Sequence, residues 1–329
     1  MDAFSLNARQ SAILWLAGFR EACSLHRVFI FCFSSKALAI RTGQCFMLNG
    51  LIFLGSLFMF NSVVIPTLLW ILPSECGQFG SEHLCQSGTA LALYSFTRHV
   101  LVELFYLFWF YPLYGFSIIL SNMWYNNIAR HAFEVLKSKG LHLAKVPAER
   151  SSSDNQNGMY SSRPSGLEGV VLGIGEQLYS LLLLSFFFIE VVAALLIPYI
   201  GTGISCLLNA WMYAYYCFEY KWNLSELSLD RRLEFFETNW AFFAGFGSPC
   251  VLAVCFFSRL VSYGVMAMLF PLFVLTAAGS QAEQVIDFIR RDWSGGGPGK
   301  FPIFYAADTL SMLVLRFFPN VRRDSDQFS

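Results

Sequence analysis

The sequence predicts an all-α integral membrane protein, and two observations support that fold class. Of the 329 residues, 56% are hydrophobic and 13% are charged, whereas soluble domains carry charge on roughly a quarter of their residues. Several apolar runs reach the roughly 20 residues with which a helix crosses a bilayer. The formal net charge is zero, which gives no basic footprint for nucleic-acid binding. We expect two long transmembrane helices, two helical hairpins that cross or half-penetrate the membrane, and amphipathic interfacial helices.

The N-terminal segment, residues 1–43, is expected to be amphipathic and to lie at the membrane interface. Apolar side chains recur there with helical spacing, and Arg20, Arg27 and Lys36 interrupt them. This pattern suits the membrane surface better than its interior. No small-residue cleavage site follows a clean apolar core, so we expect no cleaved signal peptide and targeting by the first spanning helix.

Residues 44–146 are expected to hold the two spanning helices. The first apolar run is 46–72, and the second long segment, 89–121, continues as a polar, basic helix. The loop between the runs, 73–88, contains no Lys or Arg, whereas the segments on either side are basic. Because short basic loops stay in the cytoplasm, we expect both termini there and the loop in the lumen.

Polar side chains inside these two runs require partners or access to an interface. Asn49 and Asn61 are expected to face protein rather than lipid. Arg98 and His99 are expected near one membrane interface. Glu103 follows His99 by four residues, so the two side chains are expected to pair on one helix face.

Two cysteines share the polar lumenal loop "PSECGQFGSEHLCQSG". An oxidising lumen would allow a disulfide between Cys76 and Cys85, and two free thiols are the alternative that the sequence leaves open. Most of the other cysteines lie in apolar runs, where a thiol behaves as a small buried hydrophobe.

The second half of the chain follows a different plan. Residues 147–169 are rich in Ser, Gly and Asn and predict a flexible cytoplasmic linker. Residues 170–278 predict two hairpins joined by an amphipathic helix at 224–240, which starts with a capping-box spacing between Asn223 and Glu226. Residues 279–329 are expected to be a cytoplasmic tail.

Three interruptions shape the predicted hairpins: "IPYIGTG" at 197–203, "GFGSP" at 245–249, and the Ser258-Arg259 pair. They suggest short arms that enter the membrane and turn back, with a return arm of only 15 residues at 204–218. Irregular backbone at membrane depth requires cover by protein or a water cavity. The distribution of Lys and Arg fits full-span and half-span hairpins equally well.

The sequence contains no recognised catalytic motif. HExxH, GxSxG and GxGxxG are absent, and the five histidines are dispersed without metal-ligand spacing. We therefore expect no enzyme activity, no catalytic residue, no cofactor and no metal site.

Ionisable residues in apolar surroundings are the remaining candidates for a site, because charge at membrane depth is costly. Arg259 has three interpretations: the lumenal tip of a full hairpin, the ion-pair partner of Glu190, or a contact for an anion. For Glu190 a buried structural hydrogen bond is the alternative. A backbone break at Gly245, Gly247 and Pro249 would free N–H groups that attract anions. These five residues form the candidate anion or structural polar site.

Long motifs carry a family resemblance that covers most of residues 11–320 and fails in the linker. Together they resemble the etoposide-induced protein 2.4 family in its plant-like form, with one departure at Asn127, where an acidic residue is expected. The motifs are "NGLIFLGS" (49–56), "LFWFYPLYGFSIILSNMWYNNIARHAFE" (107–134), "FEYKWN" (218–223) and "FFETNWAFFAGFGSP" (235–249).

This resemblance implies a non-enzymatic, multi-pass protein of the endoplasmic reticulum membrane that acts in autophagy, growth control and apoptosis. Its expected partners are the lipid bilayer and proteins that bind its cytoplasmic helices. The same superfamily includes the CysZ-type bacterial sulfate permeases, which have two long spanning helices and two half-penetrating hairpins. The alternative function is therefore a small-anion, sulfate-like transporter or channel.

Overall fold

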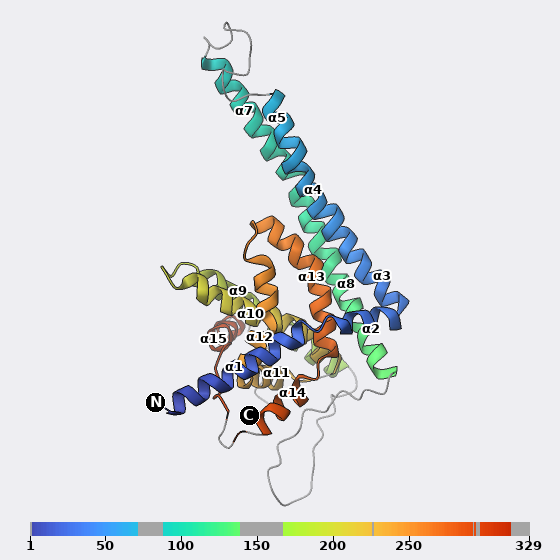
Figure 1. Cartoon of the computed structure of the whole chain (residues 1–329), viewed down its shortest axis with the longest axis vertical. Coiled ribbons are helices and arrows are strands. Elements are labelled where there is room, and N and C mark those ends of the chain that lie inside the picture. The colour runs from blue at the N-terminus through green and yellow to red at the C-terminus, as the bar shows by residue number, and fades with distance from the viewer. Residues whose placement is uncertain are drawn as a thin grey trace, which may run out of the picture. The chain divides into compact units, whose positions relative to one another are not determined.

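The computed structural model describes residues 2–71, 88–138, 167–225, 227–291, 293 and 297–316, and within them the chain is almost entirely helical, with no β-strand. The predicted all-α membrane fold class is confirmed (Figure 1). The α-helices are α1 (Asp2–Ala22), α2 (His26–Ser34), α3 (Lys36–Phe46), α4 (Gly55–Met59), α5 (Ile65–Ile71), α7 (Gly88–Phe105), α8 (Tyr111–Ser138), α9 (Leu167–Ala194), α10 (Gly201–Leu224), α11 (Leu229–Thr238), α12 (Trp240–Val254), α13 (Arg259–Gly279), α14 (Ala282–Arg291) and α15 (Tyr305–Arg316).

The chain divides into two compact units. The spanning unit consists of Phe29–Ala132 and Leu252–Leu275, and the bundle unit consists of Met1–Val28, Phe133–Val251 and Thr276–Ser329. Each unit has its own buried side chains, so each is described by itself.

Three helices are long and apolar enough to cross a membrane: Lys36–Ile71, Ala92–Ser138 and Arg259–Gly279. The first begins ten residues before the predicted start of the 46–72 run, and the second continues well beyond residue 121. The third is α13, whose 21 residues rise about 31 Å and match the roughly 30 Å hydrocarbon core. The expectation of short arms in the second hairpin is therefore wrong for α13.

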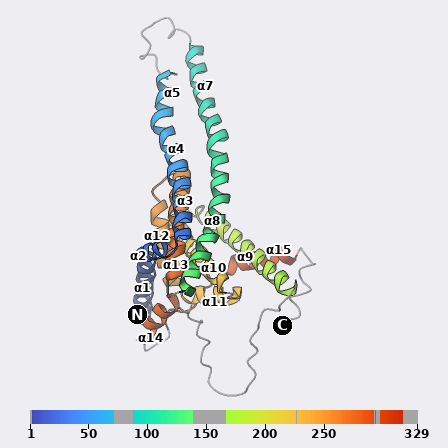
Figure 2. The same cartoon turned by 90° about the vertical axis from the view of Figure 1, so that its right-hand side faces the viewer.

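Aromatic packing joins the first two of these helices in the spanning unit. The rings of Phe60 and Phe105 stack with centroids 4.4 Å apart, and Phe110 is fully buried beside them. α5 and α7 lie side by side along this seam (Figures 1 and 2). The long helices also contain wider π-helical segments, η1 (Met47–Leu54), η2 (Phe60–Val64) and η4 (Tyr106–Phe110).

The bundle unit contains the first predicted hairpin. α9 and α10 pack against each other, and a turn at residues 195–200 joins them, as "IPYIGTG" predicts. Tyr199 takes a left-handed φ of 67° within that turn. α10 has 24 residues rather than the 15 expected of the return arm, because the helix continues through the polar sequence "FEYKWN".

The predicted helix at 224–240 is present but shorter, as α11. Its N-cap is Ser228, and Asn223 instead belongs to α10 and accepts a hydrogen bond from Arg232. The capping-box assignment is therefore wrong, because α10 extends over the proposed cap. α14 was not expected at all from the sequence.

Glycines let α12 approach two other helices of the bundle unit. A methyl group on Gly245 would lie 1.9 Å from the carbonyl oxygen of Trp15 in α1, and one on Gly247 would lie 1.7 Å from that of Ala210 in α10. Gly18 of α1 approaches Phe242 O in the same way, at 1.9 Å. Small residues permit this backbone-to-backbone packing, which is common between helices in membranes.

Some of the sequence predictions lie outside the described residues. These are the disulfide between Cys76 and Cys85, the lumenal loop as far as residue 87, and the linker apart from its last residues, where α9 begins at Leu167.

Candidate functional site

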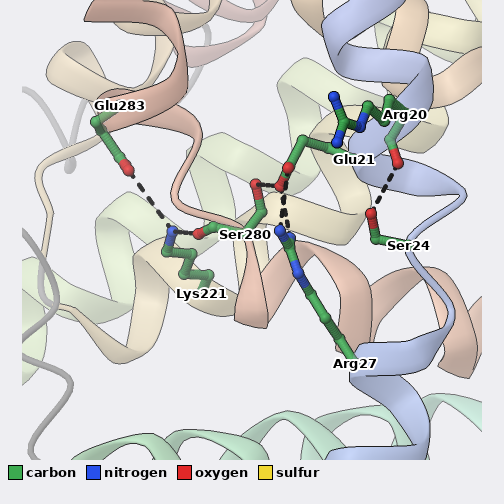
Figure 3. Close-up of polar contacts among 7 residues, drawn as sticks. All are labelled: Arg20, Glu21, Ser24, Arg27, Lys221, Ser280 and Glu283. Carbon is green, nitrogen blue, oxygen red and sulfur yellow. Dashed lines mark hydrogen bonds and ion pairs between the residues drawn. The ribbon is translucent and has the colours of Figure 1, made fainter. Parts of the chain in front are cut away.

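A buried group of four charged side chains and one serine connects four helices of the bundle unit (Figure 3). We call it the charged network; its members are Glu21 of α1, Arg27 of α2, Lys221 of α10, Ser280, and Glu283 of α14. All of these residues lie outside the three candidate membrane spans.

Direct contacts connect the members of the charged network in a chain. Arg27 donates to both carboxylate oxygens of Glu21, at 2.5 and 3.0 Å. The Ser280 hydroxyl donates to Glu21 Oε2 at 2.8 Å, and Lys221 Nζ donates to the Ser280 carbonyl oxygen at 2.7 Å. Glu283 completes the chain with an ion pair to Lys221 at 3.7 Å. The network therefore holds α1, α2, α10 and α14 together.

Burial makes it costly to keep the side chains of this network charged without partners. The side chains of Lys221 and Glu283 are each 9% exposed. Burial lowers the pKa of Lys221, and the Glu283 carboxylate opposes that shift. Lys221 lies in the last turn of α10 and Glu283 in the first turn of α14, where the helix dipoles favour their respective charges. The network thus compensates its buried charges internally.

The spanning unit holds a second polar group, which carries no formal charge. We call it the neutral network; its side chains are Asn49, Ser117, Ser121, Tyr125 and Tyr263, and all lie within the candidate spans. The Asn49 amide donates to Ser121 Oγ at 3.0 Å and accepts from the Ser117 hydroxyl. Tyr263 Oη donates to Ser117 Oγ at 3.1 Å. These bonds connect all three candidate spans.

The main-chain oxygen of Ala267 extends the neutral network. It accepts from the Asn49 amide at 3.4 Å and from Tyr125 Oη at 2.7 Å. Asn49 is fully buried, as predicted, whereas Asn61 is exposed, contrary to prediction. His99 and Glu103 are also exposed and form no ion pair with each other.

The structure places Arg259 and Glu190 in different units. Arg259 is the exposed first residue of α13, and its side chain contacts no partner in the described part of the chain. Glu190 lies on α9, partly buried, and its Oε1 atom has no hydrogen-bond partner among the described residues. The proposed ion pair between the two stays a prediction.

The predicted backbone break at Gly245–Pro249 is wrong. The segment lies within the continuous helix α12, so its N–H groups are not released for an anion. Gly245 and Gly247 instead permit close helix packing, and Pro249 is accommodated inside the helix. As to metals, no cluster of His, Cys, Asp or Glu that could hold an ion occurs in the described ranges.

Sequence reasoning missed Lys221 and Glu283. Lys221 had a weak signal, because it is a single cation at the polar end of a long apolar segment. Glu283 is 62 residues away in the chain, so no local spacing could indicate the pair.

Comparison with known proteins identifies relatives along almost the whole chain. The sequence profile of the family described as "Sulfate transporter CysZ/Etoposide-induced protein 2.4" matches residues 24–271. Protein EI24 homolog of Arabidopsis thaliana is 57% identical over 311 residues, which cover 94% of this chain and 96% of that protein. Protein EI24 homolog of Dictyostelium discoideum is 25% identical over 307 residues, covering 93% and 84%.

A third relative matches over a shorter stretch. Ectopic P granules protein 4 of Caenorhabditis elegans is 30% identical over 169 residues, which cover 50% of this chain and 46% of that protein. No solved structure matches. Since the family profile and the Arabidopsis protein both cover most of the chain, this protein belongs to the family of the sulfate transporter CysZ and etoposide-induced protein 2.4.

Proposed function

We propose that this chain is a non-enzymatic, multi-pass protein of the endoplasmic reticulum membrane, with both termini in the cytoplasm, that acts in autophagy and in the control of growth and cell death. The observation that carries the proposal is the match to the Arabidopsis protein EI24 homolog, at 57% identity over 94% of the chain.

The charged network supports this proposal. Its cations and carboxylates contact one another and the neighbouring Ser280, so their geometry suits the assembly of helices. An assembled bundle could present a defined surface to protein partners.

Deletion of the gene and complementation would test the proposal. We expect turnover of autophagosome cargo to fall in deletion cells and to recover with the wild-type chain. Lys221→Met should not restore turnover, because it breaks the charged network, whereas Lys137→Met should restore it, because Lys137 is exposed. Unchanged turnover in the deletion cells would contradict the proposal. Fluorescent tagging would test the compartment, and protease protection of tags at each end would test the topology.

Transport of a small anion such as sulfate is the second candidate, and one observation favours it. Arg259 is an exposed cation without a partner in the described residues, next to exposed Phe256 and Phe257. Sulfate flux into liposomes that carry the purified chain would test this function. Flux that Arg259→Ala abolishes and Arg259→Lys retains would support transport through this site. Flux equal to that of empty liposomes, where a known permease is active, would exclude it.

A further inference from the structure

The C-terminal helix α15 has one face that is packed against the bundle unit. Phe304, just before the helix, contacts the ring of Phe187 in α9 with centroids 5.1 Å apart. Tyr179 Oη of α9 donates to the Asp308 carboxylate, and Ala307 and Ser311 are fully buried on the same face. α15 therefore docks on α9, beside which it lies in Figure 2.

The opposite face of α15 is exposed and apolar. Tyr305 is 71% exposed and Leu313 is 50% exposed, and Leu310 and Met312 are exposed beside them. The only polar side chain along the middle of this face is Thr309, whose hydroxyl already donates to the Tyr305 carbonyl oxygen at 2.7 Å. A surface helix in water normally places charged residues on its outward face.

The exposed face of α9 has the same character. Leu178, Leu181, Phe188 and Ile189 are exposed along one stripe, and the Ser185 hydroxyl within it donates to the Leu181 carbonyl oxygen at 2.7 Å. The segment Leu178–Ala194 is one of the shorter apolar helices of the chain. Two adjacent helices thus present an extended apolar surface. Such a surface indicates contact with another apolar phase or partner, whereas a single exposed leucine would not.

We propose that the exposed face of α15 contacts the lipid bilayer, so that this part of the C-terminal tail lies in the membrane interface rather than free in the cytoplasm. The 12 residues of α15 rise about 18 Å, too short to cross the roughly 30 Å core, so the helix lies along the surface. Arg316 in its last turn can reach lipid phosphates, as basic residues at membrane interfaces commonly do.

Lipid fits this face better than a protein partner does. The exposed side chains of α15 carry no charge before Arg316, so they offer no electrostatic complement to a specific surface. Because α15 packs directly on an apolar helix of a membrane protein, one lipid phase can cover the exposed faces of both. A second copy of the chain, or another segment of it, would give a different cross-linking product.

Photocross-linking of the full-length chain in phosphatidylcholine vesicles tests the proposal. A photoreactive amino acid at Leu313 should yield lipid adducts by mass spectrometry, and one at Asp287, exposed on the charged helix α14, should yield none above background. Leu107, exposed in the second candidate span, serves as the lipid-facing reference. Adducts at Leu107 without adducts at Leu313, or a cross-link from Leu313 to protein instead of lipid, would overturn the proposal.

Hydrogen exchange provides an independent test. In vesicles, Leu313→Asp should increase the exchange of α15 amides several-fold, because a carboxylate opposes contact with lipid. If this face of α15 contacted water instead of lipid, Leu313→Asp would change the exchange of α15 amides little, since the Leu313 side chain is exposed. Equal exchange in the variant and the wild type in vesicles would contradict lipid contact.

Discussion

The spanning unit and the bundle unit both bury polar side chains, but they bury different kinds. The neutral network uses an amide and hydroxyls within the candidate spans, whereas the charged network uses carboxylates and cations outside them. A charge at the centre of a bilayer costs about 2.5–3.5 kcal/mol on the insertion scale, and a satisfied hydroxyl costs far less. Each unit therefore holds its helices together with the polar chemistry that its surroundings tolerate.

Helix ends explain why the bundle unit can use charge. Lys221 lies in the last turn of α10 and Glu283 in the first turn of α14, so each charge is placed at the favourable end of a helix dipole. Asn49, in contrast, lies in the middle of a long helix, where no free backbone groups are present to support an ion.

The largest effect is expected from breaking the charged network. Lys221→Met leaves Glu283 as a buried carboxylate without its cation, which should cost about 3–5 kcal/mol of unfolding free energy. The measurement is denaturant unfolding of the detergent-solubilised chain. Lys137→Met, at an exposed site of the same unit, is the control and should change little. Equal stability of the two variants would contradict the claim that the charged network stabilises the bundle unit.

A smaller but clear effect is expected at the close approach of α12 to α10. Gly247→Ala places a methyl group 1.7 Å from the Ala210 carbonyl oxygen, so the helices must separate, at a cost of about 1–3 kcal/mol. Gly203→Ala in α10 meets no atom within 4 Å and is the matched control. Thermal unfolding of both variants would check this. A Gly247→Ala chain as stable as Gly203→Ala would show that packing in the bundle unit is looser than described.

The neutral network should contribute less than the charged one. Asn49→Ala removes bonds to Ser117 and Ser121, and such interhelical hydrogen bonds in membranes average about 0.6 kcal/mol. We expect a loss of about 1 kcal/mol in the same unfolding assay. Asn61→Ala, at an exposed position, should be neutral. A loss at Asn49 as large as that at Lys221 would remove the distinction between the two networks.

The smallest effect is expected at an exposed ion pair of the bundle unit. Lys300 lies 3.2 Å from Glu237, but its side chain is 54% exposed, so solvent screens the pair. Lys300→Ala should change the unfolding free energy by less than about 1 kcal/mol. A larger loss would mean that the exposure of an ion pair does not determine how much it contributes to the unfolding free energy of this chain.

The sequence predicted those features that depend on local pattern. Apolar runs indicated the first two spans, and "IPYIGTG" indicated the turn before α10. A polar residue within a span indicated the buried Asn49, but the same pattern was wrong for Asn61, which is exposed. It failed at "GFGSP", because glycine and proline permit two outcomes, a broken helix or a closely packed one, and only the position of α1 and α10 decides between them.

The charged network could not be predicted for a different reason. Its members come from residues 21–27, 221 and 280–283, and only tertiary packing brings them together. Spacing within one helix gives no information about such pairs. Arg259, which the sequence made the more conspicuous cation, has no partner in the described part of the chain.

Two double-mutant cycles measure directly how strongly a pair in each network is coupled. One combines Lys221→Met with Glu283→Gln, and the other combines Asn49→Ala with Ser121→Ala, each measured by unfolding in detergent. Direct contact predicts a coupling energy of about 2 kcal/mol for the charged pair. It predicts about 0.6 kcal/mol for the neutral pair. A charged-pair coupling no larger than the neutral one would contradict the claim that the helices within one unit are held together by a different polar chemistry from those within the other.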